Sequence, residues 1–415
     1  MTTDAVSTPE TFARRRRVRR RPTRRALVLT HRWTSLVLGL LLVIETTSGV
    51  LVLFHTEYFR ATHQSLYHHT ASAHPVTAQQ ALETVNRQHP EFGAAWVSRD
   101  HGIYAVGDPS YTKVYGVDPG TGDVTGFANL VGGPMGFLVN LHDCGLTCVG
   151  YSGYVGALSH PVPSLGIGWL NDVSWGSAIL GTLGALMILL AVTGIITWWP
   201  GIKRFSHGFR VRTRKGRFAR DYDLHNLIGI VAVPFVLMWG VTGAAMEFPG
   251  VEKVWLAMTG GHAPDENRYV FTPHQAKGPA IGLNEATALA QKRYSGQVSY
   301  VALPQEGADY YSVSILGSYA PYRYRGFWAG DVTVYVDSHD PSHTGIVDPS
   351  KGQPAANTFY EKDFEASHFA WMVNGWWRLL WVPFGLAPLV LMVTGLSTWL
   401  VRRRNRKRRR RAAAA

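Results

Sequence analysis

Cysteine is almost absent from this chain, whose 415 residues include only Cys144 and Cys148. Two cysteines cannot form a framework of several disulfides or a four-cysteine metal site, so both are excluded. Acidic residues are also scarce, with 28 Asp and Glu against 41 Lys and Arg. The sequence has no G-x-G-x-x-G segment in a strand–helix setting, and this excludes a nicotinamide or flavin domain of that type.

Long apolar runs are present, although the mean hydropathy of −0.03 resembles that of a soluble protein. Runs near residues 34–54, 177–199, 226–246 and 380–401 are each long enough to cross a bilayer core of about 30 Å. One polar segment lies between the first and second runs and another between the third and fourth, and each is long enough for a small domain. The predicted order is a basic tail (1–30), a first span (31–56), a first polar loop (57–173), a second span (174–199), a basic loop (200–222), a third span (223–247), a second polar loop (248–367), a fourth span (368–401) and a basic tail (402–415).

The basic residues predict an orientation. Residues 1–32, 200–222 and 401–415 hold ten, eight and nine of the 41 Lys and Arg residues. Positive flanks remain in the cytoplasm, so we expect a multi-pass protein of the cytoplasmic membrane with both termini inside and both large loops outside. The first span fits an uncleaved signal anchor, and the first thirteen residues and the C-terminal tail (402–415) are expected to be disordered. Bases that flank spans predict contact with anionic lipid and not with nucleic acid.

The two cysteines fall in the first polar loop with C-x3-C spacing. A loop outside the cytoplasm lies in an oxidising environment, so a disulfide between Cys144 and Cys148 is the favoured prediction. A redox-active pair and a metal site remain as alternatives.

Histidines near the span ends share a register. His31 is followed seventeen and eighteen residues later by Ser48-Gly49, and His225 is followed at the same interval by Thr242-Gly243. The second and fourth spans both end in V-T-G-x-x-T-W, at 192–198 and 393–399. This registration predicts a duplicated two-helix unit. Ionisable groups at membrane depth usually mark function, and neutral imidazole is an axial ligand of membrane b-type haem, so the pattern suggests electron transfer.

The two polar loops contain the same succession of elements. Residues 78–89 and 284–294 have apolar side chains at helical spacing, and each is followed by alternating, strand-like runs. Each loop then has a hairpin with a tight turn, around 113–124 and 333–347. We expect each loop to form a small α+β unit, in which one helix packs on a short antiparallel sheet.

At this point the chain resembles a known family. The helix, strands and V-D-P-x-T-G-x-V hairpin resemble the PepSY domain, and the whole arrangement over roughly 25–405 resembles the PepSY-associated transmembrane helix family. That family includes iron-regulated membrane proteins and ferric-siderophore reductases. The matching motifs are His31-Arg32-Trp33, Leu141-His142, Asp223-Leu224-His225-Asn226, His368 and the V-T-G-x-x-T-W endings. The chain departs from the family in about twenty extra residues after His142 and in Phe369-Ala370 after His368.

The resemblance implies a membrane α-helical fold, a four-span bundle from a duplicated unit, with two extracytoplasmic α+β PepSY-like domains. It also implies two b-type haems. His31 and His225 enter from the cytoplasmic side and would bind an inner haem, whereas His142 and His368 would bind an outer one. His55 is an alternative outer ligand. Each histidine also has a structural interpretation, as an interfacial residue or a helix cap.

Glu45 is an acid in the middle of the first span, and we expect it to face the bundle interior, either protonated or hydrogen-bonded.

The expected function is that of an oxidoreductase, a transmembrane haem protein that passes electrons outward to a ferric siderophore or other chelated ferric iron. Its electron donor would be a separate cytoplasmic reductase or a quinol. The competing hypothesis is a membrane-anchored PepSY protein that restrains a peptidase or senses a ligand, with structural histidines and no cofactor.

Overall fold

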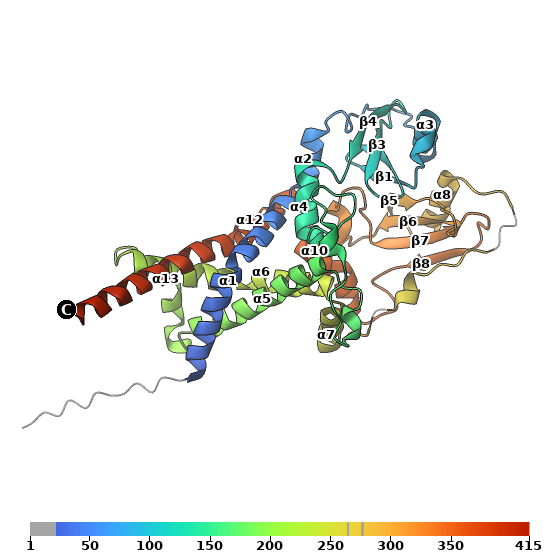
Figure 1. Cartoon of the computed structure of the whole chain (residues 1–415). Coiled ribbons are helices and arrows are strands. Elements are labelled where there is room, and N and C mark those ends of the chain that lie inside the picture. Colours follow the sequence, from blue (N-terminus) through green and yellow to red (C-terminus); the bar gives the residue numbers. More distant parts are fainter. Residues whose placement is uncertain (1–21, 264, 275–277, 415) are drawn as a thin grey trace, which may run out of the picture.

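Four long apolar helices form one end of the molecule (Figure 1). In this computed structural model, which describes residues 22–263, 265–274 and 278–414, they are α1 (Pro22–Val52), α5 (Trp175–Trp198), α6 (Arg217–Glu247) and a fourth span over Gly375–Ala412. The fourth span begins with the short helices α11 (Gly375–Arg378) and α12 (Trp381–Gly385) and continues as α13 (Ala387–Ala412). Their length and composition suit a multi-pass membrane protein, as the sequence predicted.

The surface of the helical bundle is apolar where a soluble protein would be polar. On α1 the side chains of Val37, Leu40 and Leu41 are 69%, 59% and 46% exposed, and Val393 on α13 is 59% exposed. A contiguous apolar surface of this kind is costly in water, whereas lipid tails solvate it without penalty. The exposed faces of the helices are therefore the ones that meet the bilayer.

Small residues allow the bundle helices to approach closely. A Cβ built on Gly184 of α5 would lie 2.8 Å from the backbone nitrogen of Ala244 and 3.0 Å from the carbonyl oxygen of Gly240, both on α6. Contacts this short between two backbones are characteristic of membrane helix pairs that associate through small residues. Helices α5 and α6, which belong to different halves of the chain, therefore form a tightly packed pair at the centre of the bundle.

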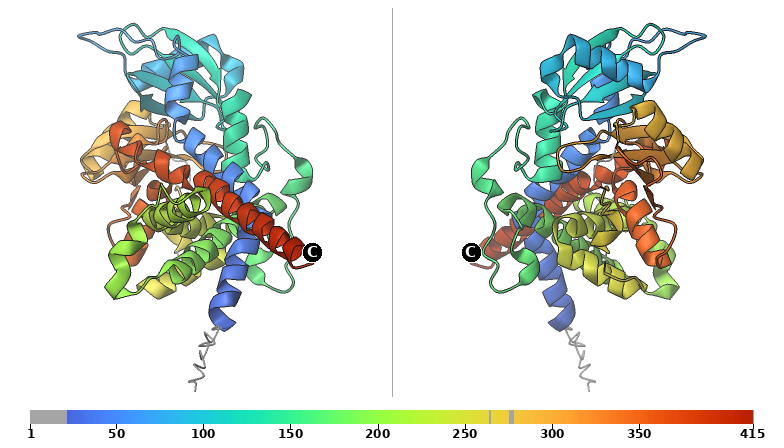
Figure 2. Two further views of the ribbon diagram at one scale, coloured as in Figure 1. Left: turned by 90° about the vertical axis from the view of Figure 1, so that its left-hand side faces the viewer. Right: turned by 90° about the vertical axis from the view of Figure 1, so that its right-hand side faces the viewer.

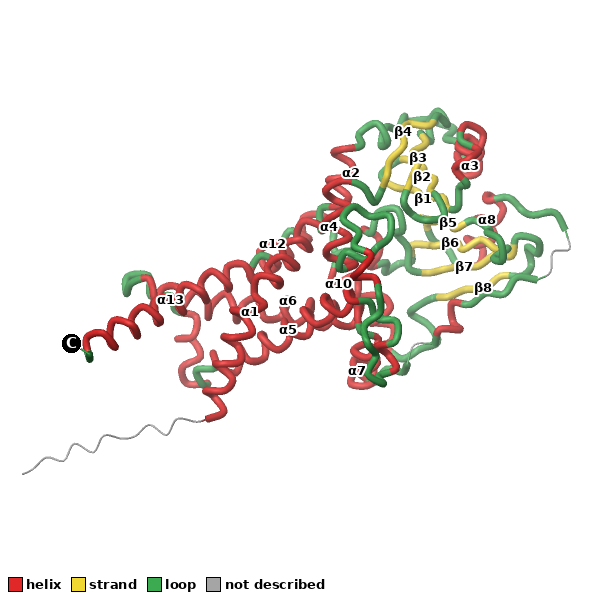
Figure 3. The backbone as a smooth tube through the Cα atoms, in the orientation of Figure 1, coloured by secondary structure: helices red, strands yellow, loops and turns green. Residues whose placement is uncertain are grey.

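All eight strands lie at the other end of the molecule (Figure 3). They are β1 (Trp96–Asp100), β2 (Ile103–Gly107), β3 (Lys113–Val117), β4 (Val124–Asn129), β5 (Gln297–Ala302), β6 (Tyr310–Leu316), β7 (Val332–Asp337) and β8 (Thr344–Val347). They form one antiparallel sheet in the order β4-β3-β2-β1-β5-β6-β7-β8. The sequence predicts a separate α+β unit in each loop, but β1 pairs with β5 in the register Trp96↔Ala302 and joins the strands of both loops into a single sheet.

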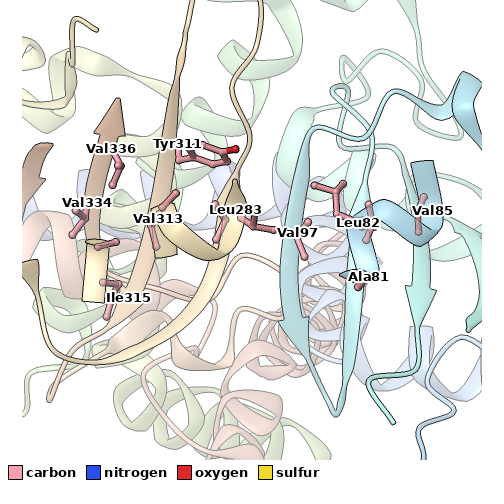
Figure 4. Packing of buried hydrophobic residues seen from close by; sticks show 14 of the residues in the cluster. Ala81, Leu82, Val85, Val97, Leu283, Tyr311, Val313, Ile315, Val334 and Val336 are labelled. Carbon is pink, nitrogen blue, oxygen red and sulfur yellow. The ribbon is translucent and has the colours of Figure 1, made fainter. Parts of the chain in front are cut away.

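One face of the sheet is covered by α3 (Ala78–Gln88) and α8 (Leu283–Arg293). Their apolar side chains share a core with alternate residues of the strands from both loops (Figure 4); the core includes Ala81, Leu82, Val85, Val97, Leu283, Val301, Val313 and Val334. A capping box begins α3, in which Thr77 and Gln80 exchange side-chain-to-backbone hydrogen bonds. Because one core serves both halves, the two loops are packed together by their side chains as well as by the β1–β5 ladder.

The opposite face of the sheet turns toward the helical bundle. Trp96, which is fully buried, points to this side and packs near Tyr300 and Phe327. The connections to the bundle run through α2 (His55–Thr62), α4 (Gly133–Cys144) and α10 (Glu365–His368), which lie between the sheet and the bundle in Figure 1. The two end-on views of Figure 2 show α1 (blue) and α13 (red) crossing one another. The remaining helices are α7 (Pro249–Thr259), α9 (Ala355–Phe359) and a π-helical turn at Tyr360–Phe364.

The C-terminal tail differs from the expected disorder, because α13 continues as a helix to Ala412. The guanidinium of Arg402 lies 5.2 Å from the ring centre of Phe218, and that of Arg403 lies 5.2 Å from Trp399. Arginine is a good helix former. The Arg402 contact holds the first turn of the tail against α6, whereas Arg403 and Trp399 lie on the same helix, α13. The predicted N-terminal tail was 1–30; its first 21 residues, including the thirteen expected to be disordered, lie outside the described residues, and residues 22–30 belong to α1.

Candidate functional site

The structure brings the four sequence-predicted histidines together in two pairs. His31 of α1 faces His225 of α6, with ring centres 6.3 Å apart and ring planes at 86°. His142 of α4 faces His368 of α10, with ring centres 6.1 Å apart and planes at 49°. We call the first the tail-side pair, because it lies toward the basic tails, and the second the sheet-side pair, because it lies toward the sheet.

The spacing within each pair suits a shared metal atom. A metal–nitrogen bond is about 2 Å long, and the ring centre lies roughly 1 Å beyond the nitrogen, so two imidazoles on opposite sides of one metal have centres about 6 Å apart. Direct stacking would bring the rings closer, and a chance arrangement would have no reason to repeat the same value. Both pairs therefore have the separation that axial ligation of one iron requires.

In three of the four histidines, a threonine on a neighbouring helix determines which ring nitrogen carries the proton. The Nδ1 atoms of His31, His225 and His368 lie 3.0, 3.1 and 2.7 Å from the hydroxyls of Thr193, Thr394 and Thr242. Each hydroxyl donates its own hydrogen to a carbonyl of its helix, at Leu189, Val390 and Met238. It can therefore only accept from the imidazole, so each ring carries Nδ1–H and keeps its Nε2 lone pair free.

The residue after each hydroxyl is a glycine that lies against the same imidazole. A Cβ on Gly194 would lie 3.5 Å from His31, one on Gly395 would lie 3.4 Å from His225, and one on Gly243 would lie 3.6 Å from His368. A Cβ on Gly49 would lie only 2.5 Å from His142. At Gly49 the absence of a side chain is a steric requirement, since real Cβ atoms do not approach so closely.

Each imidazole thus contacts a Ser-Gly or Thr-Gly pair of another helix: Thr193-Gly194, Thr394-Gly395, Thr242-Gly243 and Ser48-Gly49. In the sequence these pairs appear as markers of the repeat, and their contacts with the imidazoles were not predicted. The signal was present in the sequence, because all four histidines have a Ser-Gly or Thr-Gly pair on a neighbouring span.

His142 differs from the other three histidines in its partner. Its Nδ1 atom lies 2.9 Å from both the carboxylate Oε1 and the main-chain oxygen of Glu45, and 3.4 Å from the hydroxyl of Ser48. Burial alone would lower the pKa of His142, but Glu45 outweighs it and raises that pKa to about 9. Burial lowers the pKa of His368 to about 3. A metal on Nε2 of His142 would replace the proton there, while Glu45 keeps the proton on Nδ1.

The sheet-side pair lies in the wall of a cavity of about 690 Å³. This volume is within the range of about 300–1,000 Å³ that is typical of small-molecule and cofactor sites. Aromatic side chains such as Trp239, Phe369 and Trp371 line it, together with the guanidinium groups of Arg325 and Arg378. Five carboxylates also line it, those of Glu45, Asp143, Glu247, Glu361 and Glu365. The cavity therefore combines aromatic walls, which suit a large planar ligand, with charged groups of both signs.

The alternative ligand His55 begins α2 and lines the same cavity, but its ring stacks on Phe59, with centres 6.0 Å apart. Of the tryptophans near the fourth span, Trp371 and Trp381 also line the cavity, whereas Trp376 and Trp377 are 84% and 63% exposed. The two exposed tryptophans fit the aromatic belt at a membrane interface.

Cys144 and Cys148 form a disulfide directly after His142, at the end of α4. Asn140 holds the disulfide loop, because its side chain accepts from the Cys148 N–H at 3.0 Å and donates to the Ser152 carbonyl at 3.2 Å. The extra segment that separates His142 from the second span is therefore anchored to the helix that carries this histidine.

A further group of possible metal ligands lies in the loops around β7. Donor atoms of His274, Asp337 and His343 lie within 4.8 Å of one another. The Asp337 carboxylate already accepts backbone N–H groups of His274, His339 and Asp340. The two imidazoles stack with centres 3.8 Å apart, so their in-plane lone pairs lie in parallel planes and do not converge on one ion. We interpret this group as structural, because its hydrogen bonds hold the loop segments around β7 together.

Comparison with known proteins gives two matches. The sequence profile of the PepSY-associated TM region matches residues 28–402, which is most of the chain. The uncharacterized protein PA4219 of Pseudomonas aeruginosa is 26% identical to this chain over 245 residues, covering 55% of this chain. The match spans 60% of that relative's length, less than two thirds of it. Since the profile covers all four apolar helices, the sheet and both histidine pairs, the chain belongs to the PepSY-associated TM region family.

Proposed function

We propose that this protein is a membrane b-type cytochrome that passes electrons across the bilayer to chelated ferric iron. The observation that carries the proposal is the pair of imidazoles, found twice, at the separation of two ligands on one iron. His31 and His225 would hold one haem, and His142 and His368 a second. A haem iron with two imidazole ligands supplies one-electron transfer when bound.

The residues around each pair fit a resident haem. Threonine hydroxyls fix the Nδ1–H tautomer of His31, His225 and His368, which leaves the Nε2 atom free to ligate. Partners of this kind on the second nitrogen are a general feature of metal-bound histidine. On the sheet side, the cavity supplies the space, and apolar helices exclude water from the ligands.

The charge pattern supports a direction for the electrons. The basic segments at both chain ends and between the second and third spans favour a cytoplasmic location for the tail-side pair. The sheet then lies outside the cytoplasm, in the compartment where a disulfide such as Cys144–Cys148 persists. Electrons would enter at His31 and His225 and leave near His142 and His368.

The substrate class follows from the chemistry of iron chelates and from the resemblance to ferric-siderophore reductases. Siderophores hold ferric iron much more tightly than ferrous iron, so one electron is sufficient to release it. The cavity at the sheet-side pair has aromatic walls, which suit a planar chelate at its rim, and charged groups of both signs. The donor would be a separate reductase or a membrane quinol.

The alternative is a cofactor-free binding protein that uses the sheet. Strands β4 and β8 are the two edges of the sheet, and an edge can accept an extended peptide as a further strand. On this hypothesis the histidines are structural.

An absorption spectrum of the purified protein, produced with haem supplied during expression, separates the two functions. The cytochrome predicts a sharp Soret band that shifts on reduction with dithionite, and a colourless protein supports the binding protein. His225→Ala should remove about half of the haem, because it removes one ligand of one pair. His207→Ala, at an exposed site on the tail side, is the matched control and should keep full haem content. Unchanged haem in His225→Ala would contradict the tail-side assignment.

A further inference from the structure

The four histidines have unequal partners. Three share their Nδ1 proton with a neutral threonine hydroxyl, whereas His142 shares it with the carboxylate of Glu45 at 2.9 Å. We infer that Glu45 is a positioning residue that makes His142 a stronger electron donor to iron and thereby lowers the reduction potential of the sheet-side haem. This inference rests on the proposed function and extends it, because it assigns different roles to the two haems.

The first support is the buried position of the contact. The side chains of Glu45 and His142 are 16% and 12% exposed, and Glu45 lies in the middle of the apolar helix α1. Water screens such a pair poorly, so the carboxylate acts on the imidazole far more strongly than it would at a surface. A buried acid is also costly unless it has a partner, and the imidazole N–H is such a partner.

The second support is that the two halves of the chain differ at this position. Glu45 is fourteen residues after His31, and the residue fourteen after His225 is Trp239. The indole nitrogen of Trp239 donates to the backbone carbonyl of His368 at 3.2 Å and leaves its imidazole to Thr242. The carboxylate therefore occurs in only one half of the chain, although the Ser-Gly or Thr-Gly pairs that contact the imidazoles occur in both halves.

The physical effect follows from the charge of the partner. A carboxylate that accepts the Nδ1 proton draws it away from the ring and gives the imidazole part of the character of an imidazolate. The added electron density at Nε2 stabilises ferric iron more than ferrous iron, and this lowers the potential. A neutral hydroxyl that accepts the same hydrogen bond has a weaker effect.

The other charged groups of the cavity do not contact the Nδ1 atom of His142. Asp143, Glu247 and Glu365 line the cavity, as do Arg325 and Arg378. The charges of these groups contribute to the electrostatic field at the sheet-side site, but not through a bond to either imidazole. Glu45 alone among the charged residues of the described chain has a recorded bond to a histidine of either pair, so its effect should be specific to one haem.

A low potential at this site suits the proposed substrate. Iron held in a chelate that prefers the ferric state is difficult to reduce, so the donor adjacent to it must be a strong reductant. On this inference the tail-side pair would receive electrons from the donor, and a sheet-side haem of low potential would be, once reduced, a reductant strong enough for the chelate.

The test is a potentiometric titration of the purified, haem-loaded full-length protein, followed by its absorption spectrum. Glu45→Gln keeps the shape and an acceptor oxygen but removes the charge, so we expect the midpoint potential of one haem to rise while the other is unchanged. Glu247→Gln is the matched control, because it removes an acid from the same cavity without contact to a ligand. Its effect should be clearly smaller.

The identity of the affected haem is tested in the His225→Ala background, which retains only the sheet-side pair. Glu45→Gln must shift the potential of that remaining haem. A haem-loaded Glu45→Gln protein with wild-type potentials, or with equal shifts in both haems, overturns the inference and leaves the cytochrome intact. A wild-type protein that takes up no haem overturns the proposed function itself.

A measurement on the unsubstituted protein covers the case in which Glu45→Gln does not load haem. Electron paramagnetic resonance of the ferric protein should resolve two low-spin signals, and the one retained in His225→Ala should be that of the stronger ligand field. A retained signal of the weaker field overturns the inference without any substitution at Glu45.

Discussion

Gly49 of α1 lies directly against the imidazole of His142, so closely that a Cβ on the glycine would come within 2.5 Å of Cε1 and 2.8 Å of Nε2. The ring has little room to retreat, since its Nδ1 atom is bonded to Glu45 on the same helix. This contact determines where the nitrogen of the sheet-side ligand points.

Gly49→Ala should therefore displace His142 and remove the sheet-side haem while the tail-side haem remains. Gly194→Ala is the matched control, since its Cβ would lie at an ordinary 3.5 Å from His31. Haem content per protein, measured on both purified variants, checks the expectation. Equal haem content in the two alanine variants would show that the close contact at Gly49 does not matter.

Removal of a threonine partner should weaken haem binding without preventing folding. Thr394→Val keeps the side-chain shape but removes one of two acceptors for the Nδ1–H of His225, the other being the Leu391 carbonyl at 3.0 Å. Loss of such a partner typically reduces metal affinity about 10–100-fold, and we expect the lower end of that range because the carbonyl remains. Thr398→Val on the same helix is the control, because that hydroxyl bonds only the Gly395 carbonyl. Competition for haem with a soluble haem-binding protein measures the affinity. The hypothesis fails at this site if the two valine variants release haem equally.

The turn that precedes α10 depends on a buried ion pair. Lys362 in the π-helical turn lies 2.9 Å from Asp331, and their side chains are 6% and 1% exposed. Lys362→Met leaves the Asp331 charge buried and unpaired, so we expect a loss of about 3–5 kcal/mol in the stability of the domain. The double variant Lys362→Met, Asp331→Asn should recover much of that loss. Thermal unfolding followed by circular dichroism measures both, and equal losses would contradict the pairing.

The sheet should lose stability in acid because buried aspartates brace its hairpins. Burial alone would raise the pKa of Asp118, but the bonds from Thr70 and from the Gly120 N–H hold that pKa below its usual value. A carboxyl whose pKa is depressed in the folded state stabilises it above the unfolded value of about 3.9 and loses this contribution as the pH falls through the folded value.

Asp118→Asn should therefore destabilise the sheet by roughly 1–3 kcal/mol at pH 7 and have little further effect near pH 2. Melting temperatures of the wild type and the variant, recorded at both pH values, test the expectation. A difference between the two proteins that is the same at both pH values would mean that the charge of Asp118 contributes nothing.

Much of the architecture could be predicted from local sequence features. Hydropathy identified the four apolar helices, because a bilayer demands about twenty apolar residues in succession regardless of the remainder of the fold. The α+β character of the loops followed from periodicity and from hairpin turns such as the one after Asp118. His31, His225, His142 and His368 stood out because imidazoles at corresponding span ends are unusual.

Other features depend on contacts between distant segments, and no local pattern contains these. The pairing of β1 with β5 joins strands from different loops, and either strand could equally have remained an edge. Thr242 and Gly243 were visible as a repeat, but their partner His368 lies on another element. Glu45 was expected to face the interior, either protonated or hydrogen-bonded, but the sequence could not identify its partner as His142, which follows a separate domain-sized segment.

The hydrogen bonds between β1 and β5 have a mechanical consequence for His142 and His368. His142 follows β4 and His368 follows β8, the two outermost strands, so an unbroken plate of hydrogen-bonded backbone spans the distance between the segments that carry them. A continuous sheet resists both shear and separation of its strands, so we expect the distance between the two imidazoles to stay nearly constant when the charge at the site changes. In the proposed cytochrome, ligands that move little when an electron arrives would keep the reorganisation energy small, and this would allow fast transfer.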